Sequence, residues 1–251
     1  MSKPTDPRLQ PALDLLNAIS LADVQHMTDL GCGPGNVIPY LRERFPNAEL
    51  SAVDRSTEWL MLARSHHGED FACVQGDIAL WEPDHPQELI FANASLNQLH
   101  DHQNLFPRLM GFLNPGGVLA VQMPNQFKEP SHKITLEVAA HGPWAEKLAH
   151  LIPEDPVVDI ANYEDWLSSL SSTVECWEET YDQTLIGRDG VVDWVFATDL
   201  GRLREILPPD LKGPFRTELA EKLREAYPAG DDLKTQFGFR RLFIVATRSS
   251  A

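Results

Sequence analysis

Apolar and polar positions follow two different spacings along the first half of this chain, and each spacing predicts a different element. Residues 9–19 carry apolar side chains three and four positions apart, which is typical of an amphipathic helix. The runs 89–93 and 118–123 are apolar almost throughout, as expected of strands buried on both faces. The pattern further predicts strands at 24–28, 49–53 and 71–75, and helices at 37–44, after Ser56 and at 105–113.

Strand and helix thus alternate five times before Pro124. This alternation predicts an α/β fold with a doubly wound, mostly parallel sheet. A turn is expected at 114–117, where Asn-Pro-Gly-Gly separates a helix from a strand. Ligands of such sheets bind beyond the carboxyl ends of the strands, near the point where strand order reverses.

Beyond Pro124 the pattern becomes mainly helical, with strands predicted at 174–184 and 237–247. These late strands are expected to complete the same sheet. We therefore predict a single domain over residues 1–251, in which segments 126–170 and 185–235 form an inserted helical cap over the ligand-binding edge.

The composition excludes several classes of protein. A formal net charge of −16 argues against a general nucleic-acid binder, which needs a basic surface. The three cysteines lie at long, irregular spacings that suggest neither a disulfide framework nor a metal site. There is no signal-peptide pattern and no run of eighteen apolar residues. We expect a cytoplasmic protein with a small-molecule partner, no membrane partner and no metal; the sequence does not give an oligomeric state.

The stretch Asp29-Leu30-Gly31-Cys32-Gly33-Pro34-Gly35 follows the first predicted strand and precedes a helix. Three glycines within five residues suit a tight turn whose backbone a ligand approaches closely. A glycine-rich turn also occurs in loops that merely connect elements, so this signal alone is weak.

Polar residues at the ends of the next strands strengthen the prediction that a ligand binds at this turn. Asp54 lies 23 residues after Gly31, close to the spacing at which an acidic residue binds ribose hydroxyls in nucleoside-binding α/β folds. The alternative is that Asp54 only caps the following helix. Asp77 with Ile78, and Asn93, end the third and fourth strands, and Asp77 is placed to accept from an adenine amino group or to serve as a simple turn residue.

These residues resemble the class I S-adenosylmethionine-dependent methyltransferases, whose first strand ends in an acidic residue followed by GxGxG. Further segments resemble members that esterify a small polycarboxylic acid such as trans-aconitate. Those segments are 91–96, 115–124, 129–132, 193–195 and 241–246. The resemblance implies a Rossmann-like, seven-stranded sheet, with S-adenosylmethionine as cofactor and S-adenosylhomocysteine as product.

The resemblance also implies roles for single residues. Gly31 and Gly33 would pass under the methionine part of the cofactor, and Asp54 would hold the ribose hydroxyls. Asp77 and Ile78 would border adenine. The full predicted cofactor set is Asp29, Gly31, Gly33, Gly35, Asn36, Asp54, Arg55, Asp77, Ile78 and Asn93, with Asn93 near the sulfonium.

Formation of a methyl ester requires no general base, because a carboxylate with a reference pKa near 4 is ionised at neutral pH. No catalytic residue is therefore assigned. The carboxylates that do not react need basic partners, and the candidates are Arg241, His132 and His100. Each histidine also fits an ordinary polar loop.

Three other functions stay open. One is an O-methyltransferase for another small metabolite. A second is a catalytically weak S-adenosylmethionine-binding regulator, since residues 1–7 do not supply the aromatic N-terminal segment usual in the family. The third is a nucleoside- or dinucleotide-dependent oxidoreductase, which would rest only on the glycine turn and Asp54.

Overall fold

The computed structural model describes residues 9–152, 154–198 and 200–250. The contacts divide the chain into two compact units. The first comprises residues up to Pro124 with Pro156–Glu179 and the C-terminal stretch from Arg241; the second comprises Asn125–Asp155 and Thr180–Arg240. The expectation stated for residues 1–7 falls outside the described residues.

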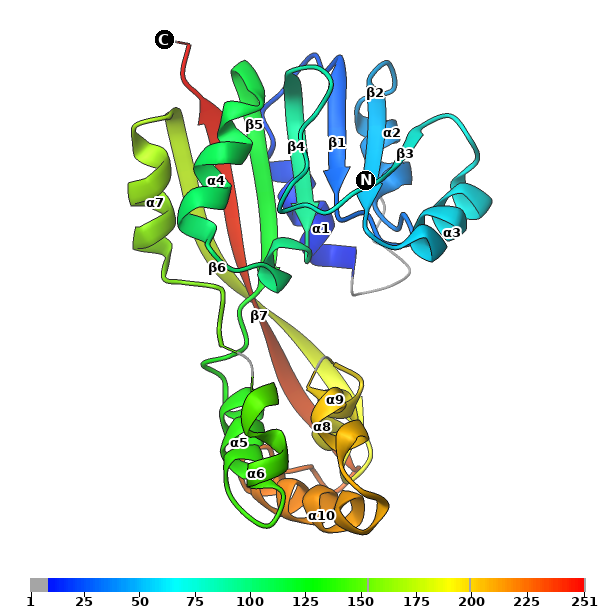
Figure 1. Ribbon diagram of the computed structural model, residues 1–251, viewed down its shortest axis with the longest axis vertical. Helices are drawn as coiled ribbons and strands as arrows, with labels where there is room; N and C mark the ends of the chain where they lie inside the picture. The colour runs from blue at the N-terminus through cyan, green and yellow to red at the C-terminus, as the bar shows by residue number, and fades with distance from the viewer. Residues whose placement is uncertain (1–8, 153, 199, 251) are drawn as a thin grey trace. The chain divides into compact units, whose positions relative to one another are not determined.

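The first unit is built on the seven-stranded sheet, whose strand order is β3-β2-β1-β4-β5-β7-β6 (Figure 1). β1 to β5 pair in parallel, and β7 runs antiparallel to β5. The strands are β1 (His26–Leu30), β2 (Glu49–Asp54), β3 (Ala72–Gln75), β4 (Gln87–Asn93), β5 (Leu113–Pro124), β6 (Ser171–Ile186) and β7 (Lys234–Arg248). The predicted α/β doubly wound, mostly parallel sheet is confirmed, and its order reverses between β1 and β4.

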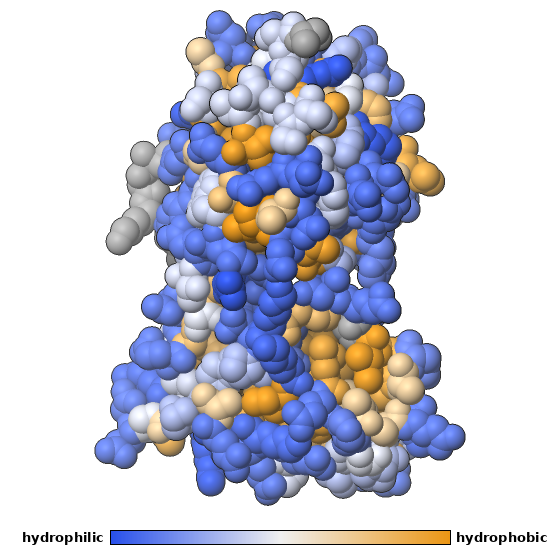
Figure 2. All heavy atoms as spheres, turned by 90° about the vertical axis from the view of Figure 1, so that its left-hand side faces the viewer, coloured by the Kyte–Doolittle hydropathy of each residue, from blue (hydrophilic) through white to orange (hydrophobic). Residues whose placement is uncertain are grey.

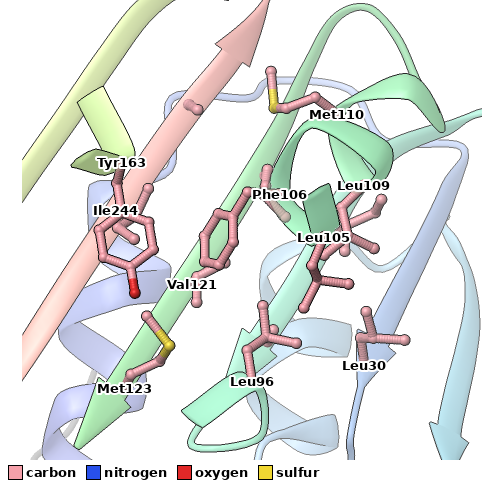
Figure 3. Close-up of a cluster of buried hydrophobic side chains, with 14 of the residues drawn as sticks. Leu30, Leu96, Leu105, Phe106, Leu109, Met110, Val121, Met123, Tyr163 and Ile244 are labelled. Atoms are coloured by element: carbon pink, nitrogen blue, oxygen red, sulfur yellow. The ribbon is translucent and has the colours of Figure 1, made fainter. Parts of the chain in front are cut away.

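Helices cover this sheet, and buried apolar side chains fill the layer between them. The helices of the first unit are α1 (Gln10–Ala18), α2 (Ile38–Arg44), α3 (Thr57–His67), α4 (His102–Gly111) and α7 (Ile160–Ser168), with the 3₁₀ turn η2 (Leu96–Gln98). On one face, Leu105, Phe106 and Leu109 of α4 meet Val121 of β5 and Ile244 of β7 (Figure 3). Removing these large apolar surfaces from water stabilises the unit.

The predicted turn at 114–117 is not an interruption between elements, because β5 begins already at Leu113. The pairing with β4 passes from Gln87↔Leu113 to Leu89↔Val118, so residues 114–117 form a bulge within a continuous strand. Gly116, with φ +81°, allows the backbone to make this excursion.

Segment 156–170, predicted to be part of the helical cap, belongs to the sheet-containing unit. The reason is packing: Tyr163 and Leu167 of α7 are buried in the same apolar cluster as α4. The Tyr163 hydroxyl also lies 2.7 Å from Nδ1 of buried His102. Residues 156–170 therefore help to form the core beside the sheet.

The second unit is mainly helical and has its own apolar core, which includes Trp144, Phe215 and Phe237. Its helices are α5 (Pro130–Ala140), α6 (Ala145–Leu148), η3 (Ala149–Leu151), α8 (Gly190–Phe196), α9 (Gly201–Ile206) and α10 (Pro209–Ala226). Parts of β6 and β7 complete it. Trp144 donates its indole N–H to the Val138 carbonyl at 2.6 Å, so this large side chain is buried with its polar group satisfied.

The face of the molecule in Figure 2 is mostly hydrophilic, with hydrophobic atoms in separate patches. Within the described part of the chain, no helix combines the length and the apolar character needed to cross a membrane.

Candidate functional site

A cavity of about 660 Å³ lies in the first unit at the carboxyl ends of β1 to β4. This is the edge at which ligands bind in such sheets, and it includes the β1–β4 reversal of strand order. Its lining contains nine of the ten residues predicted to bind the cofactor: Asp29, Gly31, Gly33, Asn36, Asp54, Arg55, Asp77, Ile78 and Asn93. The strand ends thus bring together residues that are up to 64 positions apart in the sequence.

The three glycines of the turn have positive φ angles but different surroundings. A Cβ on Gly31 would lie 2.2 Å from the Ser95 Cβ, so the backbone can approach the β4 turn only without a side chain. A Cβ on Gly33 would meet no atom within 4 Å, because this residue faces the cavity. Gly31 therefore serves packing, and Gly33 keeps the cavity open.

Gly35 is the one predicted cofactor residue outside the lining. A Cβ there would lie 2.9 Å from His67 and 3.0 Å from the Ala63 Cβ, both on α3. The third glycine thus allows the turn to pack on a neighbouring helix, a role that the spacing of glycines in the sequence cannot distinguish from ligand contact.

Asp54 joins the turn after β1 to the start of α3. Its Oδ2 accepts from the Gly33 N–H at 2.9 Å, and its Oδ1 accepts from the Ser56 N–H at 2.8 Å. Ser56 itself caps α3 by accepting from the Trp59 N–H at 3.2 Å. A carboxylate has about four lone-pair positions, so Asp54 retains capacity for further donors from the cavity.

Asp29 is a buried carboxyl group whose hydrogen bonding is incomplete. It is only 2% exposed, and its Oδ2 has no partner. Burial, followed by the nearby negative charge of Asp54, raises the pKa of Asp29 to about 7. Asn93 at the end of β4 also has a buried side-chain oxygen without a partner. Both residues line the cavity, so two buried oxygens without a hydrogen-bond partner belong to residues of its wall.

Other lining residues were not predicted from the sequence as ligand contacts. The main ones are Trp59, Ser95 and Leu99. Trp59 sits in the first turn of α3 and is 47% exposed, which is unusual for a tryptophan. Trp59 falls in the helix predicted after Ser56, and only the structure shows that it lines the cavity.

Asp77 and Ile78 lie in the turn after β3, where the Asp77 carboxylate accepts from the Ala79 N–H at 2.9 Å. Asp77 thus shapes its own turn while it lines the cavity. Both of the roles considered for it from the sequence are compatible with this position.

The three residues predicted to bind the acceptor lie in different places. Arg241 pairs with Pro124 at the carboxyl end of β5, on the same sheet edge as the cavity. His100 is exposed, in the loop before α4, and does not line the cavity. His132 belongs to α5 in the second unit.

His132 differs from the positive group that was expected. It is 8% exposed, and burial lowers its pKa to about 4. Its ring lies near those of Phe127 and Trp194, and Ser131 Oγ is 3.3 Å from Nδ1. At neutral pH the imidazole is therefore uncharged, so it can form hydrogen bonds but cannot balance an anion.

The cavity fits S-adenosylmethionine better than a dinucleotide. Unpartnered acceptors at Asp29 and Asn93 suit a cationic ligand, whereas a pyrophosphate would lie against a carboxyl group. The open space beside Gly33 admits a ligand against the backbone. Asp54 has acceptor capacity for ribose hydroxyls. The residues present thus match a nucleoside that carries a sulfonium and an ammonium group.

The fold resembles that of solved structures, which include a methyltransferase. Phosphoethanolamine N-methyltransferase 2 of Haemonchus contortus aligns over 95% of this chain and 52% of its own, with a TM-score of 0.56 and 15% identity. The YcgJ protein of Bacillus subtilis aligns over 96% and 98%, with a TM-score of 0.60 and 14% identity. The model of a methyltransferase domain family matches residues 27–117, which contain the turn, β1 except its first residue, and β2 to β4. The chain has the class I methyltransferase fold.

Sequence comparison identifies the family within the class I methyltransferases. Trans-aconitate 2-methyltransferase of Shigella dysenteriae is 38% identical, over 96% of this chain and 94% of its own. The enzymes of the same name from Yersinia pseudotuberculosis and Azoarcus sp. are each 40% identical, over at least 95% of this chain and 93% of theirs. The chain belongs to the trans-aconitate 2-methyltransferase family. It is a methyltransferase, and its cofactor is S-adenosylmethionine.

Gly31 and Gly33, two glycines that line the cavity, should respond differently to substitution. Gly31→Ala should destabilise the fold because of the clash with Ser95. Gly33→Ala should cost only about 1–2 kcal/mol from its positive φ, but it should weaken S-adenosylhomocysteine binding because the methyl group enters the cavity. Urea unfolding and calorimetric titration measure the two effects. Equal losses of stability and affinity in both variants would contradict this distinction.

Cofactor affinity should depend on the ionisation of Asp29. Below pH 7 its carboxyl group is largely protonated in the free protein, and a bound cation favours the ionised form. Affinity for S-adenosylhomocysteine, whose ammonium group is retained, should rise between pH 5.5 and 7.5 and then level off. Asp29→Asn should lose most of this rise, whereas Asp70→Asn, at a surface ion pair with Arg42, should keep it. The same pH profile in wild type and Asp29→Asn would refute the assignment.

His132 should make folding stability sensitive to acid. Because its pKa is lower in the folded protein than in the unfolded chain, stability is lost as pH falls from about 6.5 to 4. Wild type should lose about 3 kcal/mol relative to His132→Gln over this range. Urea unfolding at several pH values measures the free energy of unfolding of both proteins. Contributions from other titrating groups cancel in the difference between them. A difference independent of pH would show that His132 is not held neutral by burial.

Proposed function

We propose that this chain transfers the methyl group of S-adenosylmethionine to one carboxylate of trans-aconitate and forms a methyl ester. The observation that carries the proposal is the 38–40% identity, over almost the whole chain, to several trans-aconitate 2-methyltransferases. A small acidic acceptor also agrees with a cavity at the edge of the sheet rather than a broad basic surface. A cytoplasmic location and the absence of nucleic-acid and membrane partners remain parts of this proposal.

The cofactor is proposed to lie along the ends of β1 to β4. The Asp54 carboxylate would accept from the ribose hydroxyls while it keeps its bonds to Gly33 and Ser56. Asp29 and Asn93 would accept from the cationic methionine end, and Asp77 with Ile78 would border adenine. When bound, S-adenosylmethionine supplies an electrophilic methyl group on a sulfonium.

The protein's part in the reaction is positioning. The acceptor carboxylate is already ionised at neutral pH, so no side chain has to remove a proton. The chain must instead hold the carboxylate oxygen in line with the methyl carbon and exclude water, since orientation alone lowers the barrier substantially. Arg241, at the carboxyl end of β5, is proposed to bind a carboxylate that does not react, because its guanidinium is always charged and can form two hydrogen bonds.

Two alternative functions can be distinguished from this proposal by identifying the reaction product. A different small-metabolite O-methyltransferase would methylate another acid or a hydroxyl group. A regulator that only binds the cofactor would show affinity without turnover. The buried, incomplete hydrogen bonding of Asp29 supports cofactor binding in either case, so it does not distinguish between them.

The function is tested with ¹³C-methyl S-adenosylmethionine and a set of di- and tricarboxylic acids. We expect a methyl-ester resonance with trans-aconitate and loss of that signal after mild alkaline hydrolysis. Asp54→Ala should reduce cofactor affinity by about 30-fold, equivalent to about 2 kcal/mol for the lost ribose bonds. Asp70→Ala serves as the surface control. A methylated amine or thiol, or binding without any ester, would refute the proposal.

A further inference from the structure

Gln122 is a buried polar residue of β5 that none of the roles above uses. It is 1% exposed, yet its side-chain nitrogen Nε2 has no hydrogen-bond partner. Its neighbours along the strand, Val121 and Met123, belong to the apolar cluster under α4 (Figure 3). Because successive side chains of a strand alternate between faces, Gln122 lies on the opposite face of the sheet.

The neighbouring strand places Gln122 beside the cavity. Gln122 and Asn93 are Cα partners in the parallel pairing of β5 with β4, so their side chains share one face of the sheet. Asn93 lines the cavity, and its Oδ1 also lacks a partner. The two residues are therefore neighbours on adjacent strands, and each keeps a buried side-chain atom without a partner: an acceptor on Asn93 and a donor on Gln122.

These two atoms suit ligands of opposite character. The Asn93 oxygen accepts and thus fits the cationic cofactor, whereas the Gln122 nitrogen donates and fits an anionic oxygen. The lining residues of the cavity include the ends of β1, β2 and β4 and the turn after β3, and none of them belongs to β5. Gln122 thus lies one strand beyond Asn93, on β5, which is the next strand of the sheet after the last one that contributes proposed cofactor residues.

We propose that Gln122 Nε2 donates a hydrogen bond to a carboxylate of the methyl acceptor and so determines where the acceptor lies relative to Asn93. This inference rests on the proposed function, because it requires an anionic acceptor. A neutral amide suits this role because it orients the carboxylate without forming an ion pair. An ion pair would make the attacking carboxylate oxygen a much weaker nucleophile. Arg241, by contrast, supplies charge.

A ligand-binding role and a purely structural role of Gln122 predict opposite effects of its substitution on the melting temperature. A buried donor without a partner weakens folding, and replacing it by an apolar group of similar size is neutral or stabilising. If Gln122 serves ligand binding, Gln122→Leu should keep or raise the melting temperature while it impairs only acceptor binding. If Gln122 supports the fold, the same change should lower the melting temperature and weaken cofactor and acceptor binding together.

The experiment measures cofactor and acceptor binding separately. S-adenosylhomocysteine is titrated into wild type, Gln122→Leu and Gln122→Glu, and trans-aconitate is then titrated into each S-adenosylhomocysteine complex. We expect unchanged S-adenosylhomocysteine affinity in Gln122→Leu and acceptor affinity weakened about tenfold or more. Gln122→Glu should bind the acceptor more weakly still, because its carboxylate repels the anion. In turnover, KM for trans-aconitate should rise in Gln122→Leu, with a smaller change in kcat.

Gln103→Glu is the matched control, because it makes the same chemical change at an exposed position of α4 and should leave both affinities unchanged. Wild-type acceptor affinity and KM in Gln122→Leu would overturn the role of Gln122 alone. Wild-type protein that binds S-adenosylhomocysteine but forms no ester from trans-aconitate would overturn the proposed function, and this inference with it. The two failures are distinguished because the second is seen without any substitution.

Discussion

The bond between the Asp54 carboxylate and the Gly33 N–H is the constraint on which the site depends. It joins the turn after β1 to the end of β2, and a second bond from Ser56 joins the same carboxylate to the start of α3. Two further N–H groups of the turn, on Gly31 and Cys32, donate to the Val53 carbonyl at 2.8 and 3.0 Å. The turn is therefore held in shape by the neighbouring strand before any ligand arrives, which lowers the entropy cost of binding.

This preorganised frame carries polar atoms that the protein itself does not satisfy. Asp29, Asn93 and Gln122 lie at the ends of β1, β4 and β5, and each has a buried atom without a partner. Such groups each cost on the order of 1–3 kcal/mol in folding. Their concentration at the edge where the sheet reverses its strand order is explained if ligands complete their hydrogen bonding. Cofactor cation and acceptor anion would then meet at adjacent strands.

The sequence was sufficient to predict the fold and to select nine residues that line one cavity, because strand ends can be located from apolar runs and parallel strands bring those ends to one edge. It could not distinguish Gly35, which packs on α3, from Gly31 and Gly33, since all three look alike in the motif. It also missed Trp59 and the neutral state of His132, because exposure and pKa depend on tertiary neighbours. The division of residues 126–170 between two units likewise depends on the packing of Tyr163 against α4.

A crystal structure of the protein with S-adenosylhomocysteine and trans-aconitate bound together would test this arrangement of ligands directly. We expect ribose hydroxyls on Asp54, the cofactor ammonium group near Asp29 and Asn93, and an acceptor carboxylate oxygen within hydrogen-bond distance of Gln122 Nε2. An acceptor bound away from the end of β5, or a cofactor whose ribose does not contact Asp54, would contradict it.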